Sequence, residues 1–276
     1  MDTSAGKEGV DARAGGGPRH SLSAWLDRPI TLRLLSLAAV LTIWQLVGVR
    51  MPLQTSYPSA IIQAAYETMA SDVLPAFVDT ATGFAVGYLI AVVLGVPIGL
   101  LMARSRIVEL ALKPYVFALN ATPRIAFIPL LILWLGLTFE MRVAVVVMSG
   151  IFPIMVNTYL GAKEVDRELL DTGLAFDASR HQMLKTIVFP ASLPYTFAGL
   201  RIGMGRSLIG IIVAEIESSV IGVGHLIDYN AQTLQIAEMF VPIIMLGVFS
   251  ILFTAMLVRF ERWATMPWLR RRKATA

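Results

Sequence analysis

The sequence of 276 residues contains no cysteine, which excludes disulfides, thiolate metal ligands and thiol catalysis. It is also poor in charge, with 15% charged residues against about 25% in a typical soluble domain. Hydrophobic residues make up 56%, and the mean hydropathy is +0.70. This composition argues against a water-soluble domain and against a chain that is disordered throughout. It predicts an all-α, polytopic membrane protein with about six transmembrane helices.

Motifs of catalysis and nucleotide binding are missing as well. There is no His-Glu-x-x-His, no Gly-x-Ser-x-Gly and no Gly-x-x-x-x-Gly-Lys-Ser/Thr phosphate loop. Three histidines in the whole chain disfavour a metal site. We therefore predict that this chain is not an enzyme, has no catalytic residue and binds no metal or cofactor. If ATP drives its activity, a partner subunit must use that ATP.

Six apolar stretches are predicted to cross the membrane, and four of them are free of charge. These four are residues 34–49, 81–103, 143–162 and 239–258. The stretch 113–137 is interrupted by prolines and Arg124, and the stretch 193–214 carries Arg201 and Arg206. Pro breaks are tolerated in membrane helices when neighbours satisfy the freed carbonyls. Residues 57–70 are predicted to form a short amphipathic helix outside the membrane, and 217–238 a second outer connection.

Lysine and arginine are distributed very unevenly around these spans. With six spans, 18 of the 23 basic residues fall on the side of the two termini, and only Arg50 and Arg142 fall on the other. The positive-inside rule then predicts that both termini are cytoplasmic, in the inner (plasma) membrane of a bacterium. The net charge of +4 follows from this topology, so we predict contact with membrane lipid and no nucleic-acid partner. The predicted organisation is a disordered cytoplasmic tail (1–30), a transmembrane domain (31–265) and a basic cytoplasmic tail (266–276).

The cytoplasmic loop 163–190 is too long and too regular for a simple turn. Its apolar residues recur at helical spacing from about 164 to 176, which predicts one helix. Asp177 is predicted to lie at a break, since Asp adopts left-handed backbone angles more readily than most residues. Ser179 and Gln182 form a capping-box pattern that starts a second helix, which Pro190 is predicted to stop. Either a docking surface or a hairpin resting on lipid headgroups fits this pattern.

The loop resembles the coupling loop of the integral-membrane permeases of binding-protein-dependent ABC importers. Their motif reads Glu-Ala-Ala, three residues, Gly, and then an apolar-Pro pair, which corresponds here to Asp171, Gly173, Asp177 and Pro190. Gly173 thus stands for an Ala and Asp177 for the Gly. Further stretches resemble the nitrate/sulfonate/taurine/bicarbonate subgroup, and they are residues 122–136, Phe189-Pro-Ala-Ser-Leu-Pro194 with Gly199-Leu-Arg201, and Ala214-Glu215 followed by Gly222-Val-Gly224.

The resemblance implies a type I ABC importer-like permease with defined partners. These are a cytoplasmic ATP-binding subunit, an extracytoplasmic substrate-binding protein and a second copy of the chain in a homodimer. The ATPase-coupling residues are then Asp171, Gly173, Leu174, Phe176 and Asp177. The implied cargo is a small solute, an anion such as a sulfonate, nitrate, taurine or bicarbonate. From the residues alone, an ion-coupled secondary transporter or a channel remains the alternative.

Several polar residues within the spans are candidates for the substrate path, namely Asn120, Arg124, Arg201 and Glu215. An ionisable residue at membrane depth is a functional candidate by default. Arg124 either attracts an anion or lies at the cytoplasmic interface. Arg201 and Arg206 either pair with Glu215 or Glu217 or line the path. Glycine pairs four residues apart, at 83 and 87, 95 and 99, and 199 and 203, predict close helix packing.

Overall fold

The computed structural model describes residues 29–51, 55–218 and 221–274, with side chains to residue 265, and this part of the chain is helical without strands. The predicted tail 1–30 lies outside the described residues except for its last two, which begin helix α2. The long helices are α2 (Pro29–Arg50), α4 (Leu74–Arg104), α5 (Arg106–Ala121), α7 (Phe139–Lys163), α10 (Phe189–Ser218) and α12 (Ile236–Ala274). The shorter ones are α3 (Pro58–Thr68), α6 (Ile128–Leu135), α8 (Arg167–Ala175), α9 (Arg180–Met183) and α11 (Val223–Gln232).

Five of these helical segments are long and apolar enough to cross a membrane, and a bent pair makes a sixth. The bent pair is α5 with a segment that begins at the 3-10 turn η2 (Arg124–Phe127) and continues into α6, and its two halves meet at 96°. The prediction of about six transmembrane helices therefore agrees with the structure, which has five or six. The third span, however, is broken and is not a straight helix, because Pro123 lacks the N–H that would continue α5 and restricts the residue before it.

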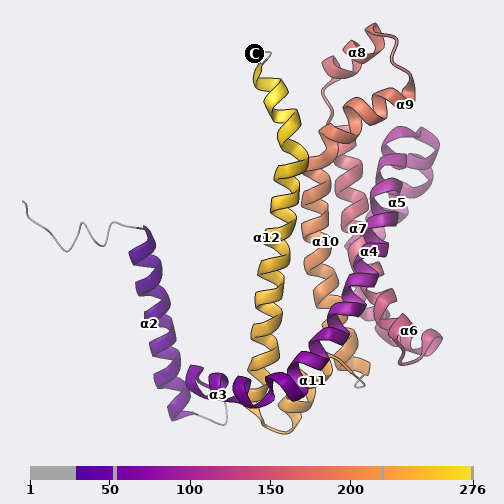
Figure 1. Cartoon of the computed structure of the whole chain (residues 1–276). Helices are drawn as coiled ribbons and strands as arrows, with labels where there is room; N and C mark the ends of the chain where they lie inside the picture. The colour runs from indigo at the N-terminus through magenta and orange to yellow at the C-terminus, as the bar shows by residue number, and fades with distance from the viewer. Residues whose placement is uncertain (1–28, 52–54, 219–220, 275–276) are drawn as a thin grey trace, which may run out of the picture.

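Helices α4, α7 and α10 form the core of the bundle, and α12 packs against them (Figure 1). The core cluster contains Phe84, Tyr88, Val146, Ile154 and Ile211, all buried. The rings of Phe84 and Tyr88 stack with centroids 5.4 Å apart, and Phe253 of α12 meets both rings edge-on. Burial of such large side chains fixes which helix faces meet.

The predicted glycine pairs lie at the tightest helix contacts. A Cβ atom at Gly87 would lie 2.6 Å from Val146 Cβ, and one at Gly99 would lie 2.7 Å from the carbonyl oxygen of Met155. On α10, a Cβ at Gly199 would lie 2.7 Å from Asn157 Cβ. No larger residue fits at these distances, so α4 and α10 both approach the backbone of α7 closely.

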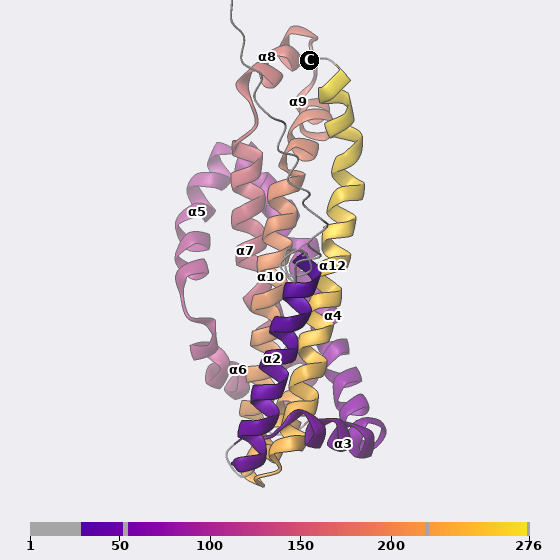
Figure 2. The ribbon, with the colours of Figure 1, turned by 90° about the vertical axis from the view of Figure 1, so that its left-hand side faces the viewer.

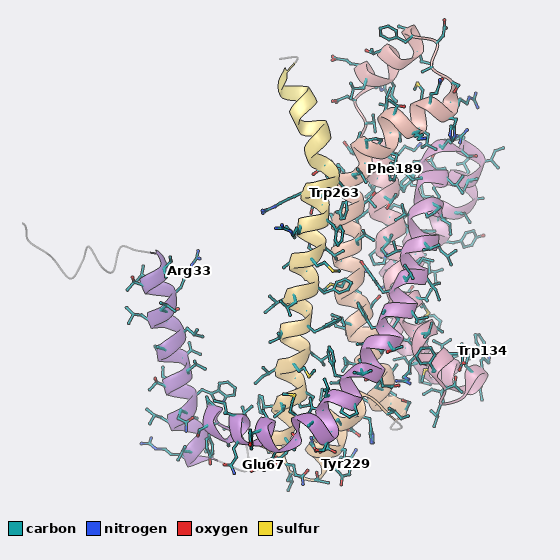
Figure 3. All side chains as sticks on the ribbon, viewed as in Figure 1. Arg33, Glu67, Trp134, Phe189, Tyr229 and Trp263 are labelled. Atoms are coloured by element: carbon teal, nitrogen blue, oxygen red, sulfur yellow. The ribbon has the colours of Figure 1, made fainter. Side chains whose placement is uncertain are left out.

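The two ends of the bundle differ in structure, and we name them by their contents. The hairpin end carries α8 and α9, and the far end carries α3 and α11 (Figures 1 and 2). Figure 3 places Glu67 of α3 and Tyr229 of α11 at the far end, and Phe189 near the hairpin end. The predicted amphipathic helix is α3, which leads through a π-turn, η1 (Met69–Val73), directly into α4.

Helix α2 stands apart from the core in Figure 1 and joins it at the far end. There Trp44 packs against Phe240 with ring centroids 5.7 Å apart, and its Nε1 donates to the carbonyl of Ser56 at 2.8 Å. Along the rest of α2 the side chains are almost all exposed, including a row of Leu, Val and Ile. An apolar helix of this kind needs lipid or a second protein surface around it.

The predicted stop at Pro190 is wrong. The segment Arg180–Ser218 is continuous, because α9 runs through a second π-turn, η3 (Leu184–Val188), into α10. In η3 the N–H of Phe189 bonds to the carbonyl of Leu184, five residues back. The wider π-turn accommodates the missing N–H of Pro190, so the helix continues where an ordinary α-turn would break.

Candidate functional site

The hairpin end consists of α8, a tight turn at residues 176–179, and α9, and we call this unit the hairpin. Asp177 has φ of +51°, as the sequence predicts for the break. Its N–H donates to the carbonyl of Leu174 at 2.9 Å, and the N–H of Ala178 donates to the carbonyl of Gly173 at 3.0 Å. These two bonds form a Schellman motif, in which glycine is the usual left-handed residue. Asp177 therefore performs the task of the motif glycine.

The second arm of the hairpin starts as predicted. Ser179 Oγ accepts the N–H of Gln182 at 3.3 Å, and Gln182 Oε1 accepts the N–H of Ser179 at 2.8 Å. This reciprocal capping box satisfies two N–H groups that a helix start would leave unpaired. The first arm begins at Arg167, three residues later than predicted, because α7 extends to Lys163. The turn between the two arms is thus fixed by backbone and capping bonds.

The two arms pack through Gly173 and leave two apolar side chains exposed. Gly173 is buried, and a Cβ there would lie 2.8 Å from Ile187 Cδ1 and 2.9 Å from Met183 Sδ. Leu174 is 61% exposed and Phe176 is 82% exposed. Asp171 lies on the exposed surface of the same helix. A groove of about 450 Å³ runs between the arms beside Phe176 and Asp177. This rigid unit with projecting apolar groups has the form of a docking surface.

The break in the third span gathers polar groups from two parts of the chain. Arg124 Nη2 donates to the main-chain carbonyl of Asn120 at 2.6 Å and lies 3.2 Å from Asn120 Oδ1. From α10, Arg206 Nη1 donates to the same Oδ1 at 3.0 Å. The guanidinium of Arg124 also lies 5.8 Å from the ring centre of Phe152. The structure thus brings together the predicted residues Asn120 and Arg124, and adds Arg206.

The depth of this break disfavours the alternative in which Arg124 lies at the interface. Helix α5 starts at the hairpin end and runs for 16 residues before it, which is about 24 Å at 1.5 Å per residue. Figure 2 shows α5 ending part-way along α7 and α10. Beyond the break, α6 turns outward and carries Trp134 at the edge of the bundle (Figure 3). A group at this depth is remote from both ends of the bundle.

The predicted pairing of Arg201 and Arg206 with Glu215 or Glu217 is wrong. Arg201 Nη2 lies 2.5 Å from Glu261 Oε2 of α12, and Arg206 contacts Asn120. Helical spacing explains the difference, because Arg201 and Glu215 lie 14 positions apart on one straight helix and cannot reach each other. The charge of Arg201 is balanced by Glu261 of α12, and the place of Arg201 in a substrate path stays a prediction.

A second charged cluster lies near the far end and was missed by the sequence reasoning. Arg142 of α7 forms ion pairs with Asp79 of α4 and with Glu215 of α10, the latter at 3.4 Å. Thr80 Oγ1 lies 2.8 and 2.9 Å from the two oxygens of Glu215, whose side chain is 0% exposed. The signal was present, since Arg142 and Glu215 adjoin predicted spans, where charges are expected to pair. We call these four residues the far-end cluster.

Two glycines let the loop after α10 reach the far-end cluster. The N–H of Val223 donates to Thr80 Oγ1 at 2.8 Å, and the N–H of Gly224 donates to Glu215 Oε2 at 2.9 Å. Gly222 has φ of +108°, and a Cβ there would overlap the carboxyl group of Glu215. The Gly-Val-Gly stretch is therefore a backbone cradle for a buried carboxylate. Glu215 has its partners within the chain, and its predicted place in a substrate path is untested.

A third cluster ties α5 to α7 at the hairpin end. Glu109 accepts a hydrogen bond from Tyr159 at 2.7 Å and an ion pair from Lys163 at 2.9 Å. Arg106 and Lys113, one turn away on α5, lie 3.5 and 3.9 Å from the same carboxylate. In the described part of the chain, no group of three His, Asp or Glu is arranged to hold a metal ion. The bonds of Glu109 to Tyr159 and Lys163 anchor α5 to α7.

Comparison with protein families gives a match over most of the bundle. The family model described as the inner membrane component of binding-protein-dependent transport systems matches residues 95–265. This range covers α5 to α11, most of α12 and the last ten residues of α4, and it includes the hairpin, the break and the far-end cluster except for Asp79 and Thr80.

Individual relatives share most of the chain. A putative aliphatic sulfonates transport permease protein of Bacillus subtilis is 31% identical, over 78% of this chain and 79% of its own length. A nitrate import permease protein of Synechocystis is 29% identical, over 79% and 83%. A formylaminopyrimidine transport permease protein of Halalkalibacterium halodurans is 32% identical, over 66% and 73%.

Proposed function

Since the chain belongs to the family of inner membrane components of binding-protein-dependent transport systems, we propose that it forms half of a homodimeric path for a small anion. It is a permease subunit of an ABC importer of the nitrate, sulfonate and bicarbonate subgroup, a transport component without enzymatic activity. The family implies an ATPase and a substrate-binding protein as partners, and a multi-pass place in the inner membrane. This assignment replaces the alternative of an ion-coupled transporter or a channel.

The hairpin is the proposed contact with the ATP-binding subunit, and its geometry is the observation that carries the proposal. Its turn is fixed at Asp177, while Leu174 and Phe176 project from it without cover in the described chain. Exposed apolar side chains on a rigid support match an interface anchor. Asp171 and Gly173 complete the proposed coupling set, one at the surface and one at the contact between the arms.

The proposed orientation places the hairpin and both termini in the cytoplasm. The basic residues of the sequence gather at the hairpin end and in the terminal segments, which supports this orientation by the positive-inside rule. The far end then faces the substrate-binding protein. ATP binding closes the paired ATPases, and the bound hairpins follow, so that the two permease copies alternate between outward and inward openings.

The proposed homodimer follows from surfaces that the single chain leaves open. Arg206 is exposed near the middle of α10, and an arginine at that depth is costly when it faces lipid. A second copy facing this side would enclose the break in a path between the subunits. The exposed length of α2 supplies a further apolar surface for such a partner.

The proposed cargo is a small anion of the sulfonate, nitrate, taurine or bicarbonate kind. The names of the sulfonate and nitrate relatives support it, and so does the positive charge of Arg124 at the break. The formylaminopyrimidine relative favours a second candidate, a pyrimidine without an oxyanion group.

Reconstitution tests this function. The chain, its ATPase and its binding protein are placed in proteoliposomes, and uptake of nitrate, ethanesulfonate, taurine, bicarbonate and formylaminopyrimidine is measured with ATP inside or outside. We expect uptake of one anion that requires ATP on the hairpin side and stops with a hydrolysis-deficient ATPase. Uptake driven by an ion gradient without the ATPase would overturn the proposal, and uptake of the pyrimidine alone would select the second candidate.

A further inference from the structure

The break in the third span places two like charges around one neutral group. Asn120 Oδ1 accepts from Arg206 Nη1 at 3.0 Å and lies 3.2 Å from Arg124 Nη2. An amide oxygen carries only a partial negative charge, so it cannot neutralise two guanidinium groups. The residues that form this arrangement come from α5, η2 and α10, and we call them the arginine pair and its bridging asparagine.

No carboxylate pairs with either arginine within the described residues. The ion pairs found there join Arg142 to Asp79 and Glu215, Arg201 to Glu261, and three basic residues to Glu109. Arg142 on α7 and Arg201 on α10 thus have acidic partners, whereas Arg124 and Arg206 have none among the described residues. Repulsion between like charges grows as water is excluded, so an unmatched pair at this depth calls for an anion.

The arginine pair also retains free donors. Each guanidinium has five N–H groups, and the bonds of Arg124 to the chain all involve Nη2. Its Nε is buried and has no hydrogen-bond partner in the described part. Meanwhile Asn120 and the ring of Phe152 hold the Arg124 side chain in place. A held arginine with unused N–H groups is prepared to bind an oxyanion in the bidentate manner.

We propose that the arginine pair and Asn120 form an oxyanion-binding subsite at the break of the third span. It takes a small sulfonate, nitrate or carbonate-type group, with one oxygen on Arg124 and another on Arg206. This inference rests on the proposed function, because the anion is the cargo on its way through the path. It selects for Arg206 the second of its two predicted roles, and it explains why a helix break, with no carboxylate beside it, lies at this point.

Binding to the purified permease–ATPase complex in lipid nanodiscs tests the subsite without the binding protein. Sodium nitrate and sodium ethanesulfonate are titrated at constant ionic strength against sodium gluconate, and the melting temperature of the permease is recorded. We expect saturable stabilisation of the wild type by at least one of the two probes. In Arg206→Gln and Asn120→Ala we expect the apparent affinity to fall about tenfold or more, and Arg206→Lys should fall between.

The matched control is Arg104→Gln, which removes one positive charge at the exposed end of α4 and should bind like the wild type. Two results overturn the inference: no saturable stabilisation of the wild type, or equal affinity in the wild type and Arg206→Gln. Uptake measured in the full system separates the two proposals. ATP-driven anion uptake with the same KM in Arg206→Gln rejects the subsite and keeps the function, whereas wild type that takes up no anion rejects the function.

Discussion

Two of the charged clusters, the far-end cluster and the one at the break, differ in how their charges are paired. In the far-end cluster, Arg142 forms ion pairs with two carboxylates. Glu215 also accepts hydrogen bonds from the Thr80 hydroxyl and the N–H of Gly224. At the break, Arg124 and Arg206 share only the amide of Asn120. A network in which every charge is paired holds its helices in one arrangement, whereas a network with unpaired N–H donors can bind a ligand. We therefore expect the first cluster to stabilise the framework, and we propose that the second lines the path.

The largest expected effect comes from removing Glu215 from the far-end cluster. Glu215→Ala removes a buried carboxylate and leaves the N–H of Gly224 unpaired, so we expect destabilisation of about 3 kcal/mol or more. The melting temperature and the amount of purified protein measure it. Glu217→Ala, two residues further on and exposed, is the control that should melt like the wild type. Equal melting temperatures for both variants would remove the far-end cluster from the framework.

The next effect concerns the hairpin, whose turn is fixed by hydrogen bonds and whose side chains Leu174 and Phe176 are exposed. Proline fixes φ near −65° and has no N–H, so Asp177→Pro cannot keep φ of +51° or the bond to Leu174. We expect ATP-driven uptake to fall to background while the subunit still inserts in the membrane. Uptake in proteoliposomes, normalised to permease content, provides the measurement. Wild-type uptake by this variant would exclude the turn from coupling.

A smaller effect is expected from removing Arg124 at the break of the third span. Arg124→Ala removes one of two unmatched charges, so the bundle should keep its stability while uptake falls about tenfold, equivalent to about 1.4 kcal/mol. Expression and uptake are compared with those of Arg142→Ala, which should lose protein and uptake together. If Arg124→Ala also lost both in equal measure, the contrast between the two clusters would disappear and Arg124 would belong to folding.

The smallest effect is expected from Asp177→Gly. Glycine adopts positive φ without strain, so the turn and its two hydrogen bonds remain, and any change in stability should stay within about 1 kcal/mol. Uptake should match the wild type, which makes this variant the control for Asp177→Pro. A large loss of uptake would mean that the carboxylate of Asp177 itself contacts the ATPase.

Features encoded locally could be predicted from the sequence, and the hairpin is the clearest case. The break at Asp177 and the capping box at Ser179 depend on residues within a few positions of each other, and both are confirmed. The apolar spans are local in the same sense. The stop predicted at Pro190 failed because a π-turn, which no residue pattern announced, accommodates the proline.

Contacts between helices could not be predicted in this way. Arg142 was counted as a loop charge, but it pairs with residues 63 and 73 positions away. Arg206 reaches Asn120 across 86 positions, and Arg201 reaches Glu261 across 60. Hydropathy indicates that such charges need partners, but only the packing of α4, α7, α10 and α12 decides which partners they find.

The unbroken course of the segment Arg180–Ser218 has a mechanical consequence. The segment begins in the second arm of the hairpin, changes direction at η3, passes Arg206 near the middle of α10 and ends at Ser218, three residues beyond Glu215 (Figure 1). Because the helical backbone is continuous from α9 through η3 into α10, we expect a displacement of the hairpin to tilt or rotate α10. Because the far-end cluster holds the other end of α10, we expect this tilt to shift Arg206 relative to Asn120 and Arg124 on the broken span.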